Sequence, residues 1–330
     1  MRIFSGIQPT GSKHFGNYSG GFRQYVETAR RGTGFFCVVD LHSITVAHDP
    51  QELRNQTLDL AAMLFATGLA DVASATVFVQ SHVTAHSEAA WLLSAVATEG
   101  ELRRMTQYKD KAKKQQSVSA GLLTYPVLMA GDILLYQTDA VPVGDDQRQH
   151  VELARDIAAR FNQRFGEVFT LPRGIFPEEG ARIMDLQDPT RKMSTSDASD
   201  AGKILMLDPP EKIAKKIRSA VTDTGSEVRR APDKPGITNL IDIMSVASGA
   251  GAEQIEADYS GKGYGQFKGD VAEAVVTLLG PIRERYLHLR NDPGELERVL
   301  AGGAEKARKE AEPTLGRMYD AMGFVPRPPG

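Results

Sequence analysis

Residues 4–18 read FSGIQPTGSKHFGNY, and this stretch decides the fold of the chain. An apolar strand at residues 4–7 leads through two glycines and a proline into a helical pattern that ends near Arg31. In an open α/β sheet, ligands bind at the carboxyl ends of the strands, where free N–H groups at a helix start attract phosphate. The stretch therefore favours a nucleotide site. Taken alone, it is equally typical of a tight turn in which His14 is a surface imidazole.

After this stretch, short apolar runs alternate with helical patterns, which is how βα units with a parallel sheet appear in a sequence. We expect strands at 35–39, 76–79 and 140–143, and helices at 51–68 and 147–165. The last helix has one apolar face, made of Val151, Ala154, Ile157, Ala158, Phe161 and Phe165. The predicted fold class is therefore α/β, with a Rossmann-like parallel sheet and a smaller α-helical domain.

The domain boundaries follow from where the strand signal fades, after about Ile183. We expect a catalytic domain over 1–185, with a mostly helical insertion at about 85–118. A helical domain over 186–290 follows, and a carboxy-terminal helical segment with a frayed tail covers 291–330.

The composition is that of an ordinary globular protein, since 41% of the 330 residues are hydrophobic and 25% are charged. A formal net charge of −3 means that a nucleic acid would have to bind local basic patches. The single cysteine, Cys37, excludes an internal disulfide and a cysteine-rich metal site. Because no leader pattern opens the chain and the most apolar window, 60–69, is short, we expect a cytoplasmic protein without a membrane partner.

A helical pattern at 123–136 places Tyr125, Met129, Asp132 and Tyr136 on one face, with Pro126 in the first turn. Asp132 is then a lone carboxylate among aromatic and thioether groups. Because burying an unpaired charge is costly, Asp132 needs a partner. A ligand N–H or O–H is one candidate, and an internal salt bridge or a backbone cap is the alternative.

Two other polar segments are candidates for ligand contacts. Residues 144–147, GDDQ, follow a predicted strand and open a helix, where acidic residues commonly act only as caps. Residues 192–197, KMSTSD, combine a lysine with hydroxyl groups, a set that suits phosphate but means little as an isolated hexapeptide. The histidines show no H-E-x-x-H pattern, and His82 with His86 is more typical of a chance pair than of a metal site.

In this order, the segments resemble the bacterial-type tryptophanyl-tRNA synthetases, which are class I aminoacyl-tRNA synthetases. GIQPTG at 6–11 with HFGN at 14–17 resembles the family's H-I-G-H motif, and KMSTS at 192–196 resembles its K-M-S-K-S loop. Further matches are VDLHSIT at 39–45, GLLTYP at 121–126, GDDQ at 144–147 and GARIM at 180–184. The similarity spans nearly the whole chain.

The resemblance implies a Rossmann catalytic domain, a helical anticodon-recognising domain and a homodimer. It also implies two chemical steps. L-Tryptophan attacks the α-phosphate of ATP to form tryptophanyl-adenylate and pyrophosphate, and the acyl group then moves to the 3′ end of tRNA(Trp).

For tryptophan, the resemblance implies that Asp132 accepts the indole N–H. Phenylalanine would leave this acceptor unpaired, which supports its rejection by roughly 10⁴ to 10⁵. The other implied contacts are a ring slot of Phe4, Met129 and Val143, head-group contacts from Tyr125 and Gln147, and His42 at the pocket border.

For ATP, the resemblance implies contacts from Gln8, Thr10, Gly16, Asn17, Gly144, Asp145, Asp146, Ile183, Lys192, Met193, Ser194 and Ser196. The expected catalytic group is Lys192, Lys111, Ser194 and Thr195. No protein nucleophile is needed, because the substrate carboxylate attacks; the protein positions the reactants and stabilises the departing pyrophosphate. Mg²⁺ would be held mainly by ATP phosphates and water, so we expect no protein metal site.

The chain departs from the family at Thr195, where the K-M-S-K-S motif has its second lysine. The loss of this ammonium predicts slower activation of tryptophan, unless Lys111 supplies more of the positive charge that stabilises the pyrophosphate. Basic residues that could bind tRNA are Lys212, Lys215, Lys216, Arg218, Arg229 and Arg230, but the pattern favours a solvated helix face for most of them.

Two other functions remain open at this point. A tyrosyl-tRNA synthetase shares the fold, although the Gln-Pro-Thr-Gly opening and the Asp132 helix favour tryptophan. A duplicated, tryptophan-binding paralogue with a regulatory role would explain Thr195. A nucleotidyltransferase of H-x-G-H ancestry would not explain the helical carboxy-terminal part.

Overall fold

The structure is a computed structural model of the 330-residue chain, and it describes residues 1–113, 117–144, 147–175, 182–194 and 199–326. The chain divides into two compact units. Unit 1 comprises Met1–Thr10, Val26–Pro177 and Asp292–Gly330, and unit 2 comprises Gly11–Tyr25 and Glu178–Asn291. The two units are described separately below.

Unit 1 is built on a parallel five-stranded sheet of order β3-β2-β1-β4-β5. The strands are β1 (Arg2–Ile7), β2 (Thr33–Val38), β3 (Ala75–Val79), β4 (Ala140–Pro142) and β5 (Arg173–Ile175). Phe4 pairs with Phe35 across β1 and β2, while Ile3 pairs with Ala140 of β4 on the other side. The strand order reverses between β1 and β4, the place where open α/β sheets bind ligands. The predicted parallel sheet is confirmed, and β5 is a strand that the sequence patterns did not reveal.

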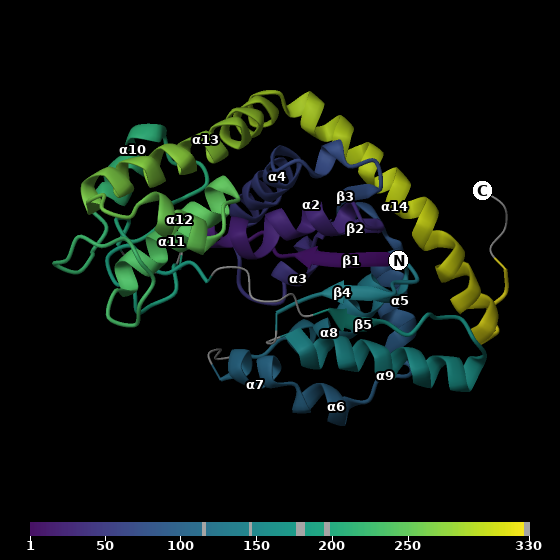
Figure 1. Ribbon diagram of the computed structural model, residues 1–330. Coiled ribbons are helices and arrows are strands. Elements are labelled where there is room, and N and C mark those ends of the chain that lie inside the picture. Colours follow the sequence, from purple (N-terminus) through teal and green to yellow (C-terminus); the bar gives the residue numbers. More distant parts are fainter. Residues whose placement is uncertain (114–116, 145–146, 176–181, 195–198, 327–330) are drawn as a thin grey trace. The chain divides into compact units, whose positions relative to one another are not determined.

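Helices cover this sheet (Figure 1). They are α2 (Arg23–Ala29), whose first residues belong to unit 2, α3 (Asp40–Ser43), α4 (Pro50–Ala66), α5 (Ala85–Ser94), α6 (Glu99–Arg104), α7 (Thr106–Ala112), α8 (Ala120–Leu134), α9 (Arg148–Phe165) and α14 (Pro293–Met322). Helix α14 lies beside β3 and α5, and α9 lies beside β5 (Figure 1). The expected helices at 51–68 and 147–165 correspond to α4 and α9.

The helix that carries Asp132 begins earlier than expected. Ser119 caps α8, because its side chain accepts the N–H of Leu122 at 3.1 Å. Since α8 starts at Ala120, Pro126 lies in the second turn and not in the first turn, as the sequence pattern suggested. Tyr136 lies in the turn just beyond the helix, although its spacing still places it near Asp132.

The carboxy-terminal residues pack within unit 1. Helix α14 buries a stripe at helical spacing, Leu296, Leu300, Ala304, Ala307, Ala311, Leu315 and Met318. The compact units are defined by contacts between residues, so their bounds differ from those of the domains expected from the sequence, at 1–185, 186–290 and 291–330. The assignment of an anticodon-recognising domain stays a prediction.

Unit 2 is largely helical, as expected. It contains α1 (Phe15–Asn17), which a π-helical turn (Tyr18–Phe22) joins to α2, and also α10 (Pro210–Arg218), α11 (Pro235–Ser248), α12 (Ala252–Asp258) and α13 (Tyr264–Asn291). Helix α13 packs against α10 and α11, and Figure 1 shows these helices gathered with α12. The helical pattern that the sequence predicts up to about Arg31 thus forms two helices, α1 and α2, with the π-helical turn between them.

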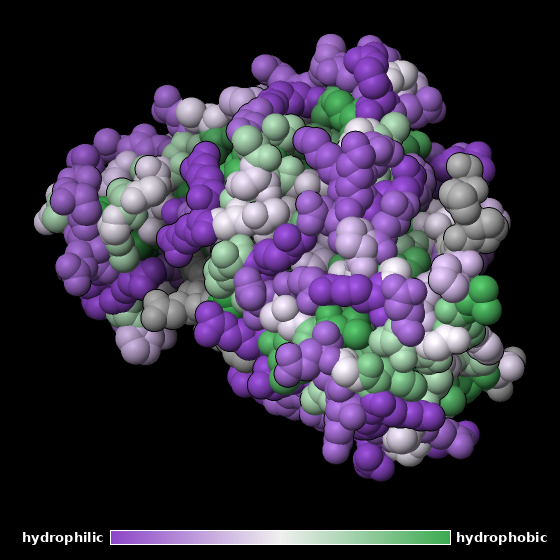
Figure 2. Space-filling model, turned by 90° about the vertical axis from the view of Figure 1, so that its right-hand side faces the viewer, coloured by the Kyte–Doolittle hydropathy of each residue, from purple (hydrophilic) through white to green (hydrophobic). Residues whose placement is uncertain are grey.

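On the face drawn in Figure 2, hydrophilic residues surround smaller hydrophobic patches. Within the described part of the chain, none of the helices has the length and apolar character needed to cross a membrane.

Candidate functional site

A buried carboxylate lies at the centre of a polar cluster in unit 1. Asp132 is only 1% exposed. Its Oδ2 lies 2.8 Å from Nε2 of His42, and its Oδ1 lies 2.7 Å from Nε2 of Gln80 and 2.6 Å from Nδ1 of His86. An ionised carboxylate can only accept hydrogen bonds, so each of these nitrogen atoms donates.

These donors keep Asp132 ionised. Burial alone would raise the pKa of Asp132, but hydrogen bonds from His42 and His86 hold the pKa well below its usual value. The sequence left open whether Asp132 has a ligand or an internal partner. The structure shows internal partners, which are two imidazoles and an amide.

Aromatic side chains surround this cluster. The Tyr136 hydroxyl lies 2.8 Å from Nε2 of His86, and burial raises the pKa of Tyr136 well above its usual value, so the hydroxyl stays protonated. The Tyr136 ring stacks on Phe4 and Phe35, with ring centroids 5.6 Å and 4.4 Å apart. Phe78 contacts the rings of both His86 and Tyr136.

Tyr125 lies about two turns before Asp132 on α8 and is also buried. Its hydroxyl is hydrogen-bonded to Nε2 of His150 at 2.8 Å, and burial raises the pKa of Tyr125 to about 12. The ammonium of Lys111, on α7, lies 5.0 Å from the centre of the Tyr125 ring. Burial lowers the pKa of Lys111. Lys111 was predicted to help the triphosphate, and here it contacts a residue predicted to bind tryptophan.

All seven residues predicted to bind tryptophan belong to unit 1: Phe4, His42, Tyr125, Met129, Asp132, Val143 and Gln147. His42 contacts Asp132 directly, and its ring lies edge-on to Tyr125. Met129 and Val143 are half-buried and pack against the hydrophobic core that contains Phe4. Gln147 lies at the start of α9, where its N–H donates to the carbonyl oxygen of Gly144. Their roles in binding tryptophan stay predictions.

Unit 2 gathers positive charge around His14. This buried imidazole precedes α1 and pairs in an antiparallel bridge with Leu205. Burial and the charges of Lys192, Lys13 and Lys203 lower the pKa of His14 to about 4, so the ring is neutral at pH 7. Three ammonium groups near a neutral ring make a site that suits phosphate.

Several residues predicted to bind ATP lie around the same histidine. A Cβ on Gly16 would lie 3.0 Å from the His14 ring, so a larger residue would require the ring to shift by a few tenths of an ångström. Asn17 Oδ1 accepts the N–H of His14 at 2.9 Å. Ile183 and Met193 are buried and joined by a backbone hydrogen bond of 3.1 Å.

The other predicted ATP and catalytic residues are exposed or half-buried, or they lie outside the described residues. In unit 2, Lys192 is exposed and Ser194 is half-buried. In unit 1, Gln8, Thr10 and Gly144 are exposed. Asp145, Asp146, Thr195 and Ser196 lie outside the residues that the structure describes. Across the described ranges, no group of three or more His, Cys, Asp or Glu residues is arranged to hold a metal ion.

Two of the candidate tRNA-binding lysines have internal partners. Lys216 is buried, and its ammonium lies 2.7 Å from Asp208 Oδ2 and 3.2 Å from Asp200 Oδ1. Lys212 pairs with Asp200 at 3.0 Å and with Asp208 at 3.1 Å. The expectation that Lys216 faces solvent is therefore wrong. Lys215 and Arg218 of α10 are exposed.

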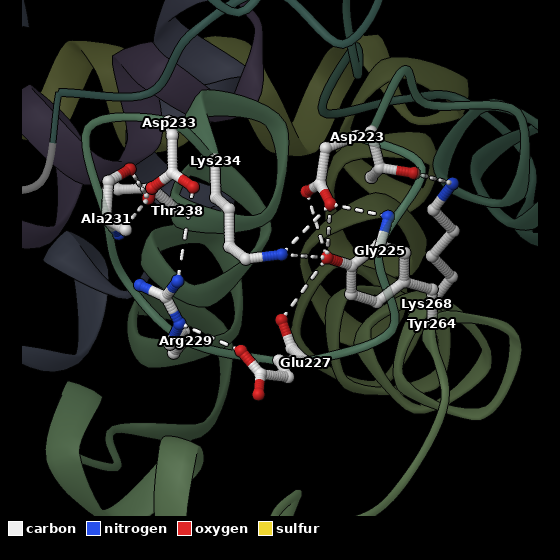
Figure 3. A network of polar contacts seen from close by, with 11 residues as sticks. Asp223, Gly225, Glu227, Arg229, Ala231, Asp233, Lys234, Thr238, Tyr264 and Lys268 are labelled. Carbon is white, nitrogen blue, oxygen red and sulfur yellow. Dashed lines mark hydrogen bonds and ion pairs between the residues drawn. The ribbon is translucent and has the colours of Figure 1, made fainter.

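A second polar network fixes the loop before α11 (Figure 3). Lys234 donates to Asp223 at 2.9 Å and to the Tyr264 hydroxyl at 2.8 Å. Arg229 pairs with Glu227 at 3.0 Å. Arg230, which Figure 3 does not label, pairs with Asp242. These two arginines are thus engaged locally while remaining partly exposed.

The sequence patterns missed Gln80, His86 and His150. His86 was interpreted as half of a chance pair with His82, yet it is fully buried against Asp132. The available signal was position: Gln80 and His86 follow β3, so they lie at the same carboxyl edge of the sheet as the other candidates.

Known proteins resemble this chain over nearly its whole length. Residues 1–280 match the family model for class I tRNA synthetases (W and Y). A tryptophan–tRNA ligase from Leifsonia xyli subsp. xyli is 54% identical over 329 residues, which cover 98% of this chain and 97% of that protein. A tryptophan–tRNA ligase 2 from Streptomyces avermitilis is 52% identical, with the same coverage of each chain.

The resemblance extends to solved structures. The crystal structure of tryptophanyl-tRNA synthetase from Campylobacter jejuni, complexed with ADP and tryptophan, matches with a TM-score of 0.84 and 35% identity. The match covers 98% of this chain and all of that one. The chain therefore belongs to the class I tRNA synthetases for tryptophan and tyrosine, and within them to the family of bacterial tryptophan–tRNA ligases.

Proposed function

We propose that the chain activates L-tryptophan with ATP and transfers it to tRNA(Trp) in the cytoplasm. The observation that carries this proposal is the ionised, buried Asp132 next to the stacked rings of Phe4 and Tyr136. An apolar ring with one N–H matches such surroundings, because the carboxylate accepts the N–H while the ring packs against apolar side chains. The ADP and tryptophan of the Campylobacter jejuni structure support the same substrates.

In the first step, a carboxylate oxygen of tryptophan attacks the α-phosphorus of ATP. The new bond joins that oxygen to phosphorus, and the bond to the bridging oxygen breaks, releasing pyrophosphate. Lys13, Lys192 and Lys203 supply positive charge around the neutral His14, which supports a role in stabilising the departing pyrophosphate. In the second step, a terminal ribose hydroxyl of tRNA attacks the acyl carbon, and AMP leaves.

Magnesium enters this proposal as part of the ATP complex. We expect the phosphates and water to supply most of its ligands, which fits the preference of Mg²⁺ for phosphate oxygens and its reluctance to lose water. The residues that would hold ATP in unit 2 are Gly16, Asn17 and the lysines near His14. They bind and orient the phosphates that carry the metal.

We also propose a homodimer. Trp91, the single tryptophan of the chain, is 79% exposed on α5, which is unusual for so large an apolar side chain. A subunit interface over α5 would cover it. For tRNA, the exposed Lys215 and Arg218 are the candidates on α10 that carry no ion pair in the described structure.

The test is amino-acid-dependent exchange of pyrophosphate into ATP, with tryptophan, tyrosine and phenylalanine compared in the intact protein. We expect exchange with tryptophan alone. Asp132→Asn should lower kcat/KM for tryptophan by roughly 10- to 100-fold, because a hydrogen bond to a charged group is lost, and should leave the KM for ATP unchanged. Faster exchange with tyrosine would overturn the proposal in favour of a tyrosyl-tRNA synthetase.

One sequence feature favours a second function. Thr195 replaces the second lysine of the K-M-S-K-S motif, which would suit a duplicated, tryptophan-binding copy with a regulatory role. Tight tryptophan binding with negligible tRNA charging would support this alternative.

A further inference from the structure

Two of the three donors that hold the Asp132 carboxylate, Gln80 and His86, are not among the residues predicted to bind tryptophan. We infer that Gln80 and His86, the latter backed by Tyr136, are positioning residues that occupy Oδ1 of Asp132 and leave Oδ2 as the single oxygen that recognises an indole N–H. This inference rests on the proposed tryptophan activity. It concerns how the selectivity for an N–H group arises.

The two oxygen atoms of Asp132 differ in the number of hydrogen bonds that they accept. A carboxylate offers about four lone-pair positions, two on each oxygen. Oδ1 accepts from both Gln80 and His86, so both of its positions are filled. Oδ2 accepts from His42 alone among the hydrogen bonds of Asp132 in the described structure. The remaining acceptor position is therefore on Oδ2.

The two donors to Oδ1 are themselves fixed. The Gln80 side chain is fully buried, and its Oε1 accepts the N–H of Leu41 at 3.1 Å. This bond turns the Gln80 amide nitrogen toward Asp132. His86 is also fully buried; with its hydrogen on Nδ1, Nε2 accepts the Tyr136 hydroxyl at 2.8 Å. Neither donor can turn away without losing a second hydrogen bond in the protein interior.

This arrangement prevents the carboxylate from rotating. Turning Asp132 about its last torsion angle would break two short hydrogen bonds to Oδ1 and leave buried donors unpaired. A fixed Oδ2 presents its free lone pair in one direction, so a ring that lacks an N–H leaves it unsatisfied. The selectivity against such rings then depends on Gln80 and His86, which act through Asp132.

The experiment compares tryptophan with β-(3-benzothienyl)alanine, in which sulfur replaces the indole N–H. The kcat/KM of each compound is measured in ATP–pyrophosphate exchange, and the ratio of the two values reports selectivity for the N–H. We expect His86→Leu and Gln80→Met to lower this ratio at least roughly tenfold, since each removes a hydrogen bond to a charged group. The KM for ATP should not change.

Three further variants separate positioning from stability. His86→Asn keeps an amide nitrogen near the place of Nδ1, so we expect it to recover most of the ratio. Phe78→Leu loosens the packing on His86 and Tyr136 without removing a donor, so it should destabilise the fold and leave the ratio unchanged. Tyr136→Phe removes only one hydroxyl, and it should lower the ratio by a smaller factor than His86→Leu.

The outcomes distinguish the inference from the proposed function. Equal losses for tryptophan and the benzothienyl analogue in His86→Leu and Gln80→Met would overturn the inference, because both residues would then act only on stability. If His86→Leu does not fold, Gln80→Met and Tyr136→Phe decide the question by the same ratio. A wild-type protein without tryptophan-dependent exchange would overturn the proposed function, and the inference with it.

Discussion

Gly303 of α14 lies directly against the carbonyl oxygen of Val77 in β3, so closely that a Cβ at this position would overlap the oxygen. The neighbouring Gly302 has open space around its Cα hydrogen. This close approach explains how α14 reaches the sheet of unit 1. It also gives the first prediction, because two adjacent glycines in one helix should respond oppositely to the same substitution.

Gly302→Ala should raise the free energy of unfolding by roughly 0.5–1 kcal/mol, because alanine loses less backbone entropy in a helix. Gly303→Ala should lower it by roughly 1–3 kcal/mol, because the helix must move away from Val77. Urea denaturation of both variants measures the difference. Equal effects would show that α14 is not held against β3 at Gly303.

Lys216 and Lys215 make a second matched pair on α10. Lys216→Ala leaves Asp208, itself 5% exposed, without its closest partner and should cost roughly 3 kcal/mol of unfolding free energy. Lys215→Ala should change stability by less than about 0.5 kcal/mol. Only Lys215→Ala should weaken tRNA binding without loss of stability and reduce its salt dependence. Recovery of stability in the double variant Lys216→Met/Asp208→Leu would support the ion-pair explanation.

The stability of the fold should decrease below neutral pH because of His14. Its folded pKa of about 4 lies below the unfolded value of 6.5, so the unfolded chain binds a proton first as the pH falls. The contribution of His14 is thus present above pH 6.5 and is lost progressively toward pH 4. Between pH 7 and pH 5 this loss should be roughly 1–2 kcal/mol.

The control for this pH dependence is His14→Asn, which carries no titratable ring. Thermal unfolding at pH 5 and pH 7 should show a smaller difference in this variant than in the wild type. An identical difference in both proteins would mean that other groups cause the loss.

Replacing Thr195 with lysine should accelerate activation. Thr195→Lys restores the ammonium that the K-M-S-K-S motif carries, and one further charge on the departing pyrophosphate should increase the exchange rate at least roughly tenfold. Thr195→Gln provides a longer side chain without charge and should leave the rate near that of the wild type. If the rate of Thr195→Lys is also unchanged, Thr195 causes no deficit.

Much of the fold could be predicted because its signals are local. The parallel strands and the helices α4 and α9 follow from apolar periodicity, which each segment carries by itself. The strand β5 is only three residues long and has no apolar pattern, so it was missed. The true start of α8 depended on the Ser119 cap, which one hydroxyl residue signals only weakly.

The sequence by itself determined the family, the fold class and the position of Asp132 on a helix face, because motifs and helical spacing are properties of neighbouring residues. Only the tertiary structure decided what that carboxylate contacts. His42, Gln80 and His86 come from three other segments, 90, 52 and 46 residues away, and the parallel sheet brings them together at one edge. Burial then makes these contacts obligatory, since an unpaired charge there would be too costly.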